Sequence, residues 1–262
     1  MRFCPLVSGS SGNSTYVGTE HTHLLVDAGV SGKKIETELA KLSLSGHQLD
    51  GIFVTHEHLD HIKGIGVLSR RYDLPVYATE GTWQAMEADL GKIAPKNKKM
   101  LYCGEKTVIN DLVVSPFAIP HDAAEPVGFT FLDGKSKVAV ATDIGHPSEE
   151  VKDGICDCNA LLLEANHDIE MLKRGPYPYA LKQRILGDHG HMANVTAGML
   201  LAEMMTERLQ VVFLGHLSAE NNTPPLAYHD VSETLYQNHI RVGRDVALQL
   251  AERCGVSALV EV

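Results

Sequence analysis

The feature that most constrains this chain is a run of metal-type side chains, His56-Glu57-His58-Leu59-Asp60-His61, directly after the apolar residues 51–55. In an extended segment, residues two apart point to the same side, so the rings of His56 and His58 can bind one metal ion. Asp60 and His61 lie where the chain turns into a helix and can reach a second ion. The alternatives, a helix N-cap for Asp60 and isolated histidines, explain single residues but not the whole run. The run therefore predicts a two-metal site at the carboxyl end of a strand.

Short apolar runs between turns predict strands, and helical spacing of apolar residues predicts the helices between them. We expect strands at residues 2–7, 14–17, 23–27, 51–55, 76–78, 107–115, 127–132, 137–142, 161–163 and 210–214. We expect helices at residues 31–44, 60–71, 82–90 and 192–206, and a lysine-rich loop that contains Lys92, Lys96, Lys98 and Lys99. Because the chain has no low-complexity linker or proline-rich hinge, we expect one domain, residues 1–262, made of two αβ halves.

Composition argues against several kinds of partner. The formal net charge is -10, which disfavours nonspecific binding to nucleic acid or anionic lipid. A nucleic-acid substrate remains compatible, because bound cations offset acidity where a phosphate approaches. No signal peptide or membrane-spanning run is visible, and five cysteines do not form a disulfide framework, so we expect a cytoplasmic protein without a membrane partner. Cys156 and Cys158 could hold metal, but two small residues before a buried strand is the favoured interpretation.

Three further metal-type residues, His121, Asp143 and His216, each follow a later apolar run that is typical of a strand. Together with Val26-Asp27-Ala28-Gly29 and residues 56–61, they resemble the motifs of the metallo-β-lactamase superfamily over nearly the whole chain. The resemblance implies an α/β (α+β) fold, the four-layer αββα sandwich. It also implies two divalent metal ions per chain, for which histidine and aspartate ligands permit Zn²⁺, Mn²⁺ or Fe²⁺.

The resemblance assigns roles to these residues. It implies that one metal is bound by His56, His58 and His121, the other by Asp60, His61 and His216, and that Asp143 bridges them. Three carboxylates could orient ligand histidines from behind, or could equally be turn or cap residues: Asp27, Asp122 and Asp168.

Four longer segments, at residues 8–14, 164–168, 187–194 and 216–222, resemble the YycJ/WalJ/VicX group of this superfamily. That group is encoded beside a cell-wall two-component system, is regarded as containing DNA exonucleases, and is related to tRNA 3′-processing endonucleases. The resemblance implies that His191 protonates the leaving oxygen and that Glu164 orients it. Residues 8–14 could bind a phosphate or form a plain turn, and other roles stay open: those of His167, His189, Asn221 and Asn222.

The first functional hypothesis is a dinuclear metal-dependent phosphodiesterase, most specifically a DNA exonuclease. In this hypothesis a metal-bridging hydroxide attacks phosphorus. The catalytic residues would be Asp60, His191 and Glu164. The alternatives are a small-molecule hydrolase of the same fold, acting on a cyclic phosphodiester, thioester or lactone, and a non-enzymatic regulator of a two-component system. The lysine-rich loop could follow a nucleic-acid backbone or be a solvated loop. We identify no basic stripe interleaved with aromatic residues that would favour stacking of a single strand.

Overall fold

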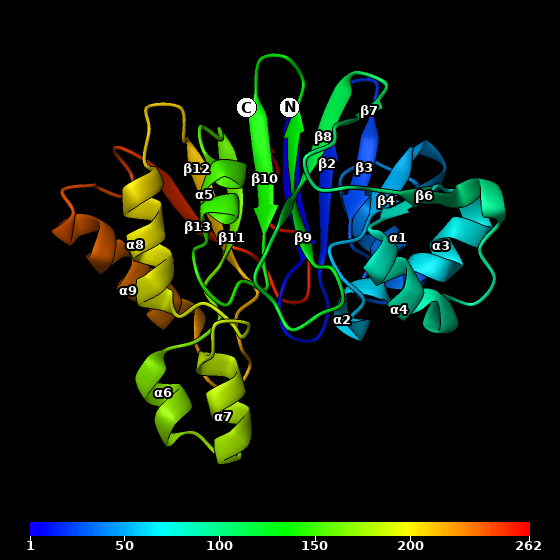
Figure 1. The fold of residues 1–262 in the computed structure, drawn as a ribbon. Coiled ribbons are helices and arrows are strands. Elements are labelled where there is room, and N and C mark those ends of the chain that lie inside the picture. The colour runs from blue at the N-terminus through cyan, green and yellow to red at the C-terminus, as the bar shows by residue number, and fades with distance from the viewer.

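The computed structural model describes residues 1–262, and its centre is a pair of seven-stranded sheets packed face to face (Figure 1). The first sheet has the order β14-β1-β2-β3-β4-β5-β6 and the second β13-β12-β11-β10-β9-β8-β7. The first comprises β1 (Arg2–Val7), β2 (Ser14–Gly18), β3 (His23–Val26), β4 (Gly51–Phe53), β5 (Val76–Ala78), β6 (Lys98–Met100) and β14 (Val260–Glu261). The second comprises β7 (Thr107–Ile109), β8 (Leu112–Ala118), β9 (Val127–Leu132), β10 (Lys137–Ala141), β11 (Ala160–Glu164), β12 (Val211–Gly215) and β13 (Ala247–Leu250).

Helices cover the outer face of each sheet, which confirms the predicted αββα order. Those beside the first sheet are α1 (Gly32–Lys41), α2 (Leu59–Ile62), α3 (Ile65–Tyr72) and α4 (Glu80–Leu90), with short 3₁₀ turns at Gly46–Gln48 and Pro95–Asn97. Those of the second half are α5 (Glu149–Ile155), α6 (Ile169–Arg174), α7 (Tyr179–Leu186), α8 (Asn194–Met204) and α9 (Pro224–Gln237). No helix combines the length and apolar character needed to cross a membrane.

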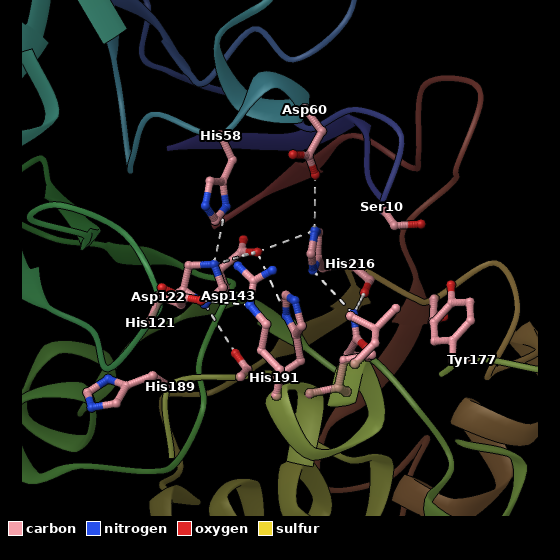
Figure 2. A pocket seen from close by; sticks show the side chains of 16 residues that line it. Ser10, His58, Asp60, His121, Asp122, Asp143, Tyr177, His189, His191 and His216 are labelled. Carbon is pink, nitrogen blue, oxygen red and sulfur yellow. Dashed lines mark hydrogen bonds and ion pairs between the residues drawn. The ribbon is translucent and has the colours of Figure 1, made fainter. Parts of the chain in front are cut away.

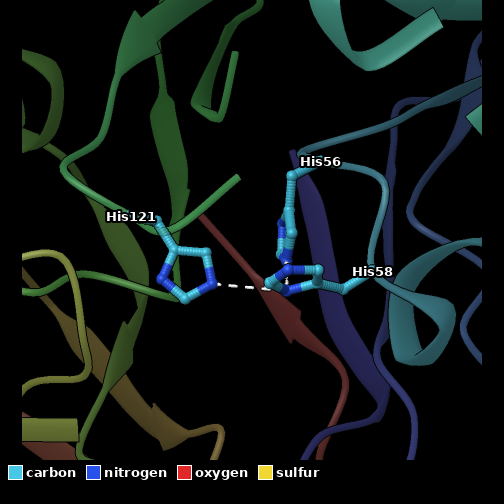
Figure 3. Close-up of side chains that lie close together, drawn as sticks. All are labelled: His56, His58 and His121. Atoms are coloured by element: carbon cyan, nitrogen blue, oxygen red, sulfur yellow. Dashed lines mark hydrogen bonds between the residues drawn. The ribbon is translucent and has the colours of Figure 1, made fainter. Parts of the chain in front are cut away.

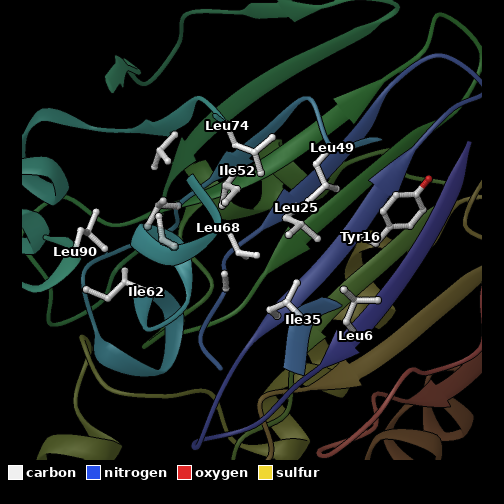
Figure 4. Packing of buried hydrophobic residues seen from close by; sticks show 14 of the residues in the cluster. Leu6, Tyr16, Leu25, Ile35, Leu49, Ile52, Ile62, Leu68, Leu74 and Leu90 are labelled. Carbon is white, nitrogen blue, oxygen red and sulfur yellow. The ribbon is translucent and has the colours of Figure 1, made fainter. Parts of the chain in front are cut away.

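Three apolar layers hold the sandwich together. The layer between the first sheet and its helices includes Leu25 and Ile52 from the sheet and Leu68 from α3 (Figure 4). Phenylalanines from both sheets, among them Phe53 and Phe129, fill the space between the sheets, and a third layer packs the second sheet against α5, α8 and α9. Because the central strands are covered on both faces, β11 and β12 are buried along their whole length.

Three expected elements differ in the structure. The single strand expected over residues 107–115 is instead the antiparallel pair β7 and β8, because the chain turns at Asn110, which has a φ of 51°. The helix expected over residues 60–71 is divided into α2 and α3, because Gly64 approaches a neighbouring loop and its N–H donates to the carbonyl oxygen of Ala28 at 2.7 Å. A Cβ at Gly64 would lie 2.5 Å from the carbonyl oxygen of Val30. The lysine-rich segment is not only a loop, since Lys98 and Lys99 belong to β6, which pairs in parallel with β5.

Segments that are distant in the sequence therefore meet where parallel strands end. β3 and β4 are parallel neighbours in the first sheet, and β10, β11 and β12 are parallel neighbours in the second. The loops after these strands, with the loop after β8, carry the histidine and aspartate motifs. The expectation of a single domain in two αβ halves stays a prediction.

Candidate metal centre

Three residues of the centre have an unusual backbone conformation. Asp27, Asp143 and His216 follow β3, β10 and β12 and have φ angles of 61°, 61° and 53°. This left-handed region is uncommon for residues other than glycine and costs on the order of 1–3 kcal/mol each. The conformation places their side chains at the junction of the two sheets, where all three contact other polar groups of the centre.

Three histidines form the first group of possible ligands, from the loops after β4 and β8 (Figure 3). The Nε2 atom of His56 lies 3.0 Å from Nδ1 of His58, which lies 3.4 Å from Nε2 of His121. Imidazole nitrogens that converge in this way suit one transition-metal cation.

A second group consists of Asp60, His61 and His216, and Asp143 lies between the two groups (Figure 2). The Oδ2 atom of Asp60 is 3.7 Å from Nε2 of His61 and 3.6 Å from Nε2 of His216. Asp143 presents Oδ2 to His61 at 3.3 Å. It presents Oδ1 to His216 at 3.4 Å and to His121 at 3.8 Å. One carboxylate therefore reaches histidines of both groups.

The polar atoms at the centre fit bound cations. Oδ2 of Asp143 and Nε2 of His216 are buried and have no hydrogen-bond partner, which is costly unless another group satisfies them. Burial lowers the pKa of His61, but the carboxylates of Asp143 and Asp27 outweigh it and raise this pKa to about 9. Burial raises the pKa of Asp143, and His216 and His61 outweigh it, so that pKa falls below its usual range. The buried carboxylates thus favour positive charge at the centre, which a divalent cation supplies.

Hydrogen bonds behind the ligands fix the rings. Nδ1 of His61 lies 2.8 Å from Oδ2 of Asp27, and Nδ1 of His56 lies 3.0 Å from Oγ1 of Thr55. Nδ1 of His121 lies 3.1 Å from the carbonyl oxygen of Gly190. A histidine that donates from Nδ1 keeps the lone pair of Nε2 free for a metal. This arrangement leaves the Nε2 atoms of all three rings available as ligands.

Glu164, at the end of β11, organises the side of the centre that faces His191. It is fully buried, and its Oε1 lies 2.9 Å from Nδ1 of His216 and 2.8 Å from Nδ1 of His191. Its Oε2 accepts the backbone N–H groups of Ile144 at 2.8 Å and Met192 at 3.0 Å. Burial raises the pKa of Glu164, but His191 and His216 outweigh it and hold that pKa well below its usual range. Glu164 is therefore an acceptor at both oxygens.

A cavity of about 270 Å³ opens onto the centre (Figure 2). His58, Asp60, Asp143, His191 and His216 line it, so all of these side chains face space that a substrate can enter. Most of the residues that line it are polar, and further wall residues come from the loop after β1 and from α7: Ser10, Leu181, Arg184 and Ile185. The cavity can therefore admit a phosphate group beside the candidate ligands.

Of the three carboxylates considered for orienting ligand histidines, only Asp27 contacts one. Asp168 caps α6 by accepting the N–H of Met171 at 2.7 Å. Asp122 pairs with Arg184 at 2.7 Å. The structure therefore favours the cap interpretation for Asp168 and a surface ion pair for Asp122.

The residues with open roles have different surroundings. His189 is exposed and points away from the cluster, whereas His167 is buried with both ring nitrogens lacking a hydrogen-bond partner. Asn222 donates to the carbonyl oxygens of Ala165 at 2.9 Å and Asn166 at 3.0 Å, so it ties two loops together. Asn221 is buried without a side-chain hydrogen bond, and neither asparagine is the N-cap of α9.

Two candidate binding segments remain, the turn at residues 8–14 and the pair of cysteines before β11. Within residues 8–14, the N–H of Gly12 donates to Gly9 and the N–H of Asn13 to Asp60, while the N–H of Gly9 donates to the side chain of Asn13. These bonds favour the turn interpretation for Gly9, Gly12 and Asn13, while Ser10 of the same turn lines the cavity. Two cysteines lie outside every cluster of metal-type residues, in agreement with the favoured interpretation: Cys156 and Cys158.

Two further residues, to which the sequence assigned no role, support the ligands. Asn13 lies with Nδ2 3.1 Å from Nε2 of His61 and 3.4 Å from Oδ2 of Asp60. Gly29 is in contact with the metal-ligand loop, because a Cβ there would lie 1.6 Å from the carbonyl oxygen of Asp60. The glycine of the Asp27-Ala28-Gly29 segment was a usable signal for this close approach. Asn13 lies in the segment 8–14 that carries the family resemblance, but nothing in the sequence indicates its contact with the ligands.

Comparison with known families decides the classification. Residues 22–213 match the family described as the beta-lactamase superfamily domain. The chain belongs to the metallo-β-lactamase superfamily. Within this superfamily it belongs to the YycJ/WalJ group, because it is 45% identical over 243 residues to "Exodeoxyribonuclease YycJ" of Bacillus anthracis, which covers 93% of this chain and 92% of that protein. It is 41% identical over 246 residues to "Exodeoxyribonuclease WalJ" of Streptococcus pneumoniae, covering 93% of this chain and 91% of that one.

Solved structures of this superfamily share the fold. The metallo-β-lactamase fold protein YhfI from Bacillus subtilis superimposes with a TM-score of 0.70 at 16% identity, covering 98% of this chain and 99% of that one. The short form of human tRNase Z gives a TM-score of 0.66 at 18% identity, with 100% of both chains covered. The predicted family, the sandwich fold and the assignment to metal-dependent hydrolases are thereby confirmed.

Proposed function

We propose that this metal-dependent hydrolase is a DNA exonuclease, a phosphodiesterase that removes nucleotides from the end of a strand. The observation that carries the proposal is the pairing of a complete two-group ligand cluster with His191, whose Nδ1 lies 2.8 Å from Glu164 and 3.8 Å from Asp143. Hydrolysis of a phosphodiester needs charge neutralisation at phosphorus and a proton for the leaving oxygen. Relatives that are named exodeoxyribonucleases and cover nearly the whole chain support the choice of DNA.

The metal-binding roles follow the two groups of side chains. His56, His58 and His121 would hold one divalent cation, and Asp60, His61 and His216 the other, with Asp143 shared between them. When bound, two such cations activate a hydroxide nucleophile and neutralise charge that develops on the phosphate. Asp60 also lines the cavity, so its carboxylate lies beside the entering substrate.

His191 is the proposed proton donor, and Glu164 positions it. The imidazole side chain of His191 is 23% exposed and lines the cavity, so it can reach a leaving oxygen there. Because Glu164 accepts from Nδ1, the proton to be transferred lies on Nε2. The same oxygen of Glu164 holds Nδ1 of His216, so one carboxylate aligns the proton donor with a metal ligand.

Glu164→Gln is expected to lower turnover by about 10- to 100-fold, the usual effect of changing a group behind a metal ligand. An amide nitrogen in place of Oε2 would oppose the N–H groups of Ile144 and Met192. In the opposite orientation the amide N–H groups would face Nδ1 of His191 and His216 in place of Oε1. Each Nδ1 would then have to accept a hydrogen bond, and the ring hydrogen would move to Nε2. Metal content and turnover measured together check this result, and wild-type values of both would contradict it.

The proposed function is tested with end-labelled single- and double-stranded DNA and RNA, incubated with the metal-reconstituted protein. We expect progressive loss of nucleotides from one end of DNA, and no loss with Asp60→Ala, because that variant lacks a ligand of the second group. A small phosphodiester ester serves as a control substrate. Cleavage of this ester without attack on any polymer would instead establish the small-molecule hydrolase.

Three finer proposals accompany this function. We propose Zn²⁺, Mn²⁺ or Fe²⁺ as the metal, which the histidine and aspartate ligands support. We propose a cytoplasmic location, which is supported by five cysteines that are all free thiols. A functional link to a two-component signalling system is supported by the resemblance to the YycJ/WalJ/VicX group alone. Metal analysis of the purified protein would decide the first of these proposals.

A further inference from the structure

Residues 169–186, which we name the α6–α7 hairpin, project from the sandwich at the edge where the candidate metal ligands lie (Figure 1). Tyr177, Leu181, Arg184 and Ile185 of this hairpin line the same cavity as the ligands. The hairpin is therefore one wall of the entrance to the metal centre.

The side chains of α7 are largely exposed to solvent. α7 has no buried residue, and Tyr179 at its start is 76% exposed. Two hydrogen bonds hold α7 in place. The side chain of Lys182 donates to the carbonyl oxygen of Lys173 at 2.8 Å, and the backbone N–H of His191 donates to the carbonyl oxygen of Ile185 at 3.0 Å. A helix without a buried face gains little stability from packing, so its surface is available for a ligand.

The charge of the hairpin is opposite to that of the chain. It contains four basic residues and one acidic residue, whereas the chain has a net charge of -10. Within it, Glu170 pairs with Lys173 at 3.4 Å and with Arg174 at 3.2 Å. Outside it, Asp122 pairs with Arg184. These pairs are solvent-exposed, and exposed pairs are worth only about 0–1 kcal/mol, so a phosphate can replace the carboxylates.

We infer that the α6–α7 hairpin binds the single-stranded end of a nucleic-acid substrate, with Tyr177 and Tyr179 stacking on unpaired bases and its basic residues pairing with phosphates beside the cleaved one. This inference rests on the proposed function. Residues 173–184, Lys-Arg-Gly-Pro-Tyr-Pro-Tyr-Ala-Leu-Lys-Gln-Arg, interleave basic and aromatic side chains, the pattern that sequence analysis did not identify. A folded protein docked on this wall would obstruct the cavity, whereas a flexible strand can pass along it into the centre.

Tyr179→Ala tests the stacking contacts, because this side chain is too exposed to be needed for folding. The probe is a fluorescent oligothymidylate with phosphorothioate linkages, bound to the metal-loaded protein and followed by anisotropy. Loss of one stacked base corresponds to a Kd raised roughly 5- to 150-fold. The Kd for a blunt duplex, whose bases are not free to stack, is expected to change less than twofold. Tyr236→Ala, which removes a tyrosine that is 63% exposed on α9, is the matched control and should leave both Kd values unchanged.

A second variant, Lys173→Gln with Arg174→Gln, tests the pairing of basic side chains with phosphates, because both side chains are exposed and pair only with Glu170. On a single strand, the slope of log Kd against log salt concentration is expected to fall by about 0.7 for each phosphate that is no longer neutralised, and therefore by about 1.4 for the two substitutions. Equal affinity and equal slope for the wild-type protein and these variants would overturn the hairpin proposal while leaving the nuclease proposal intact. A wild-type protein that neither binds nor cleaves any oligonucleotide, yet hydrolyses a small phosphodiester, would overturn both.

Discussion

Asp143→Ala is expected to reduce bound metal from two ions per chain to one or none, and to lower turnover of DNA by about 10³-fold or more. The reason is the position of this carboxylate, which faces His61 with one oxygen and His216 and His121 with the other. Asp60, in contrast, contacts no histidine outside the second group. Loss of Asp143 therefore removes the one side chain that both candidate cations would share.

Metal binding by this variant can be measured without any substrate. A ligand that binds only the folded protein stabilises it by about 2.7 kcal/mol at a concentration of 100 times its Kd. We expect added Zn²⁺ or Mn²⁺ to raise the melting temperature of the wild-type protein, and to raise that of Asp143→Ala much less. Asp89→Ala, an exposed position on α4, is the control and should respond like the wild type. Two ions per chain and a normal rate in Asp143→Ala would refute the shared-ligand assignment.

Four of the seven candidate ligands could be predicted because their motif is local, whereas His121, Asp143 and His216 were assigned through the family resemblance. His56, His58, Asp60 and His61 lie within six positions and directly after a strand, so spacing alone brings them together. The groups behind them could not be predicted in this way. Nδ1 of His61 is held by Asp27, 34 residues away, and Nδ1 of His216 by Glu164, 52 residues away. Such pairs depend on which strands become neighbours, and no residue spacing encodes that choice.

The secondary structure likewise divides into elements that the sequence predicts and elements that it does not. Strands buried on both faces, such as Ala160–Glu164, could be predicted from continuous apolar runs. α9 was not predicted, although Thr223 before two prolines and the spacing of Ala227 and Val231 gave a usable signal. α7 gave only a weak signal, because Leu181 and Ile185 are apolar at helical spacing but no residue of this helix is buried. The segment with this weak packing signature is also the one to which we assign substrate binding, where selection would act on exposed rather than buried side chains.

His191→Ala is expected to keep both metals and to lower turnover of DNA by about 10²- to 10⁴-fold, the usual contribution of a general acid. The metals are retained because Glu164 still accepts from His216 and from the backbone N–H groups of Ile144 and Met192. His191 lies in a group of metal-type residues with Asp143, Glu164 and His216, but not in the group of His56, His58 and His121 or in that of Asp60, His61 and His216. Each proposed cation therefore keeps its own three ligands in this variant.

The leaving group separates proton donation from a structural role. The sugar alkoxide released from DNA needs a proton, whereas a nitrophenolate leaves without one. We therefore expect the loss in His191→Ala to be at least tenfold smaller for a bis-nitrophenyl phosphate than for DNA. His189 also lines the cavity, but its ring is exposed and points away from the cluster, so His189→Ala should lower turnover less than tenfold. If His191→Ala slowed both substrates equally while keeping its metals, the histidine would only shape the cavity, and the proton for the leaving oxygen would have to come from water.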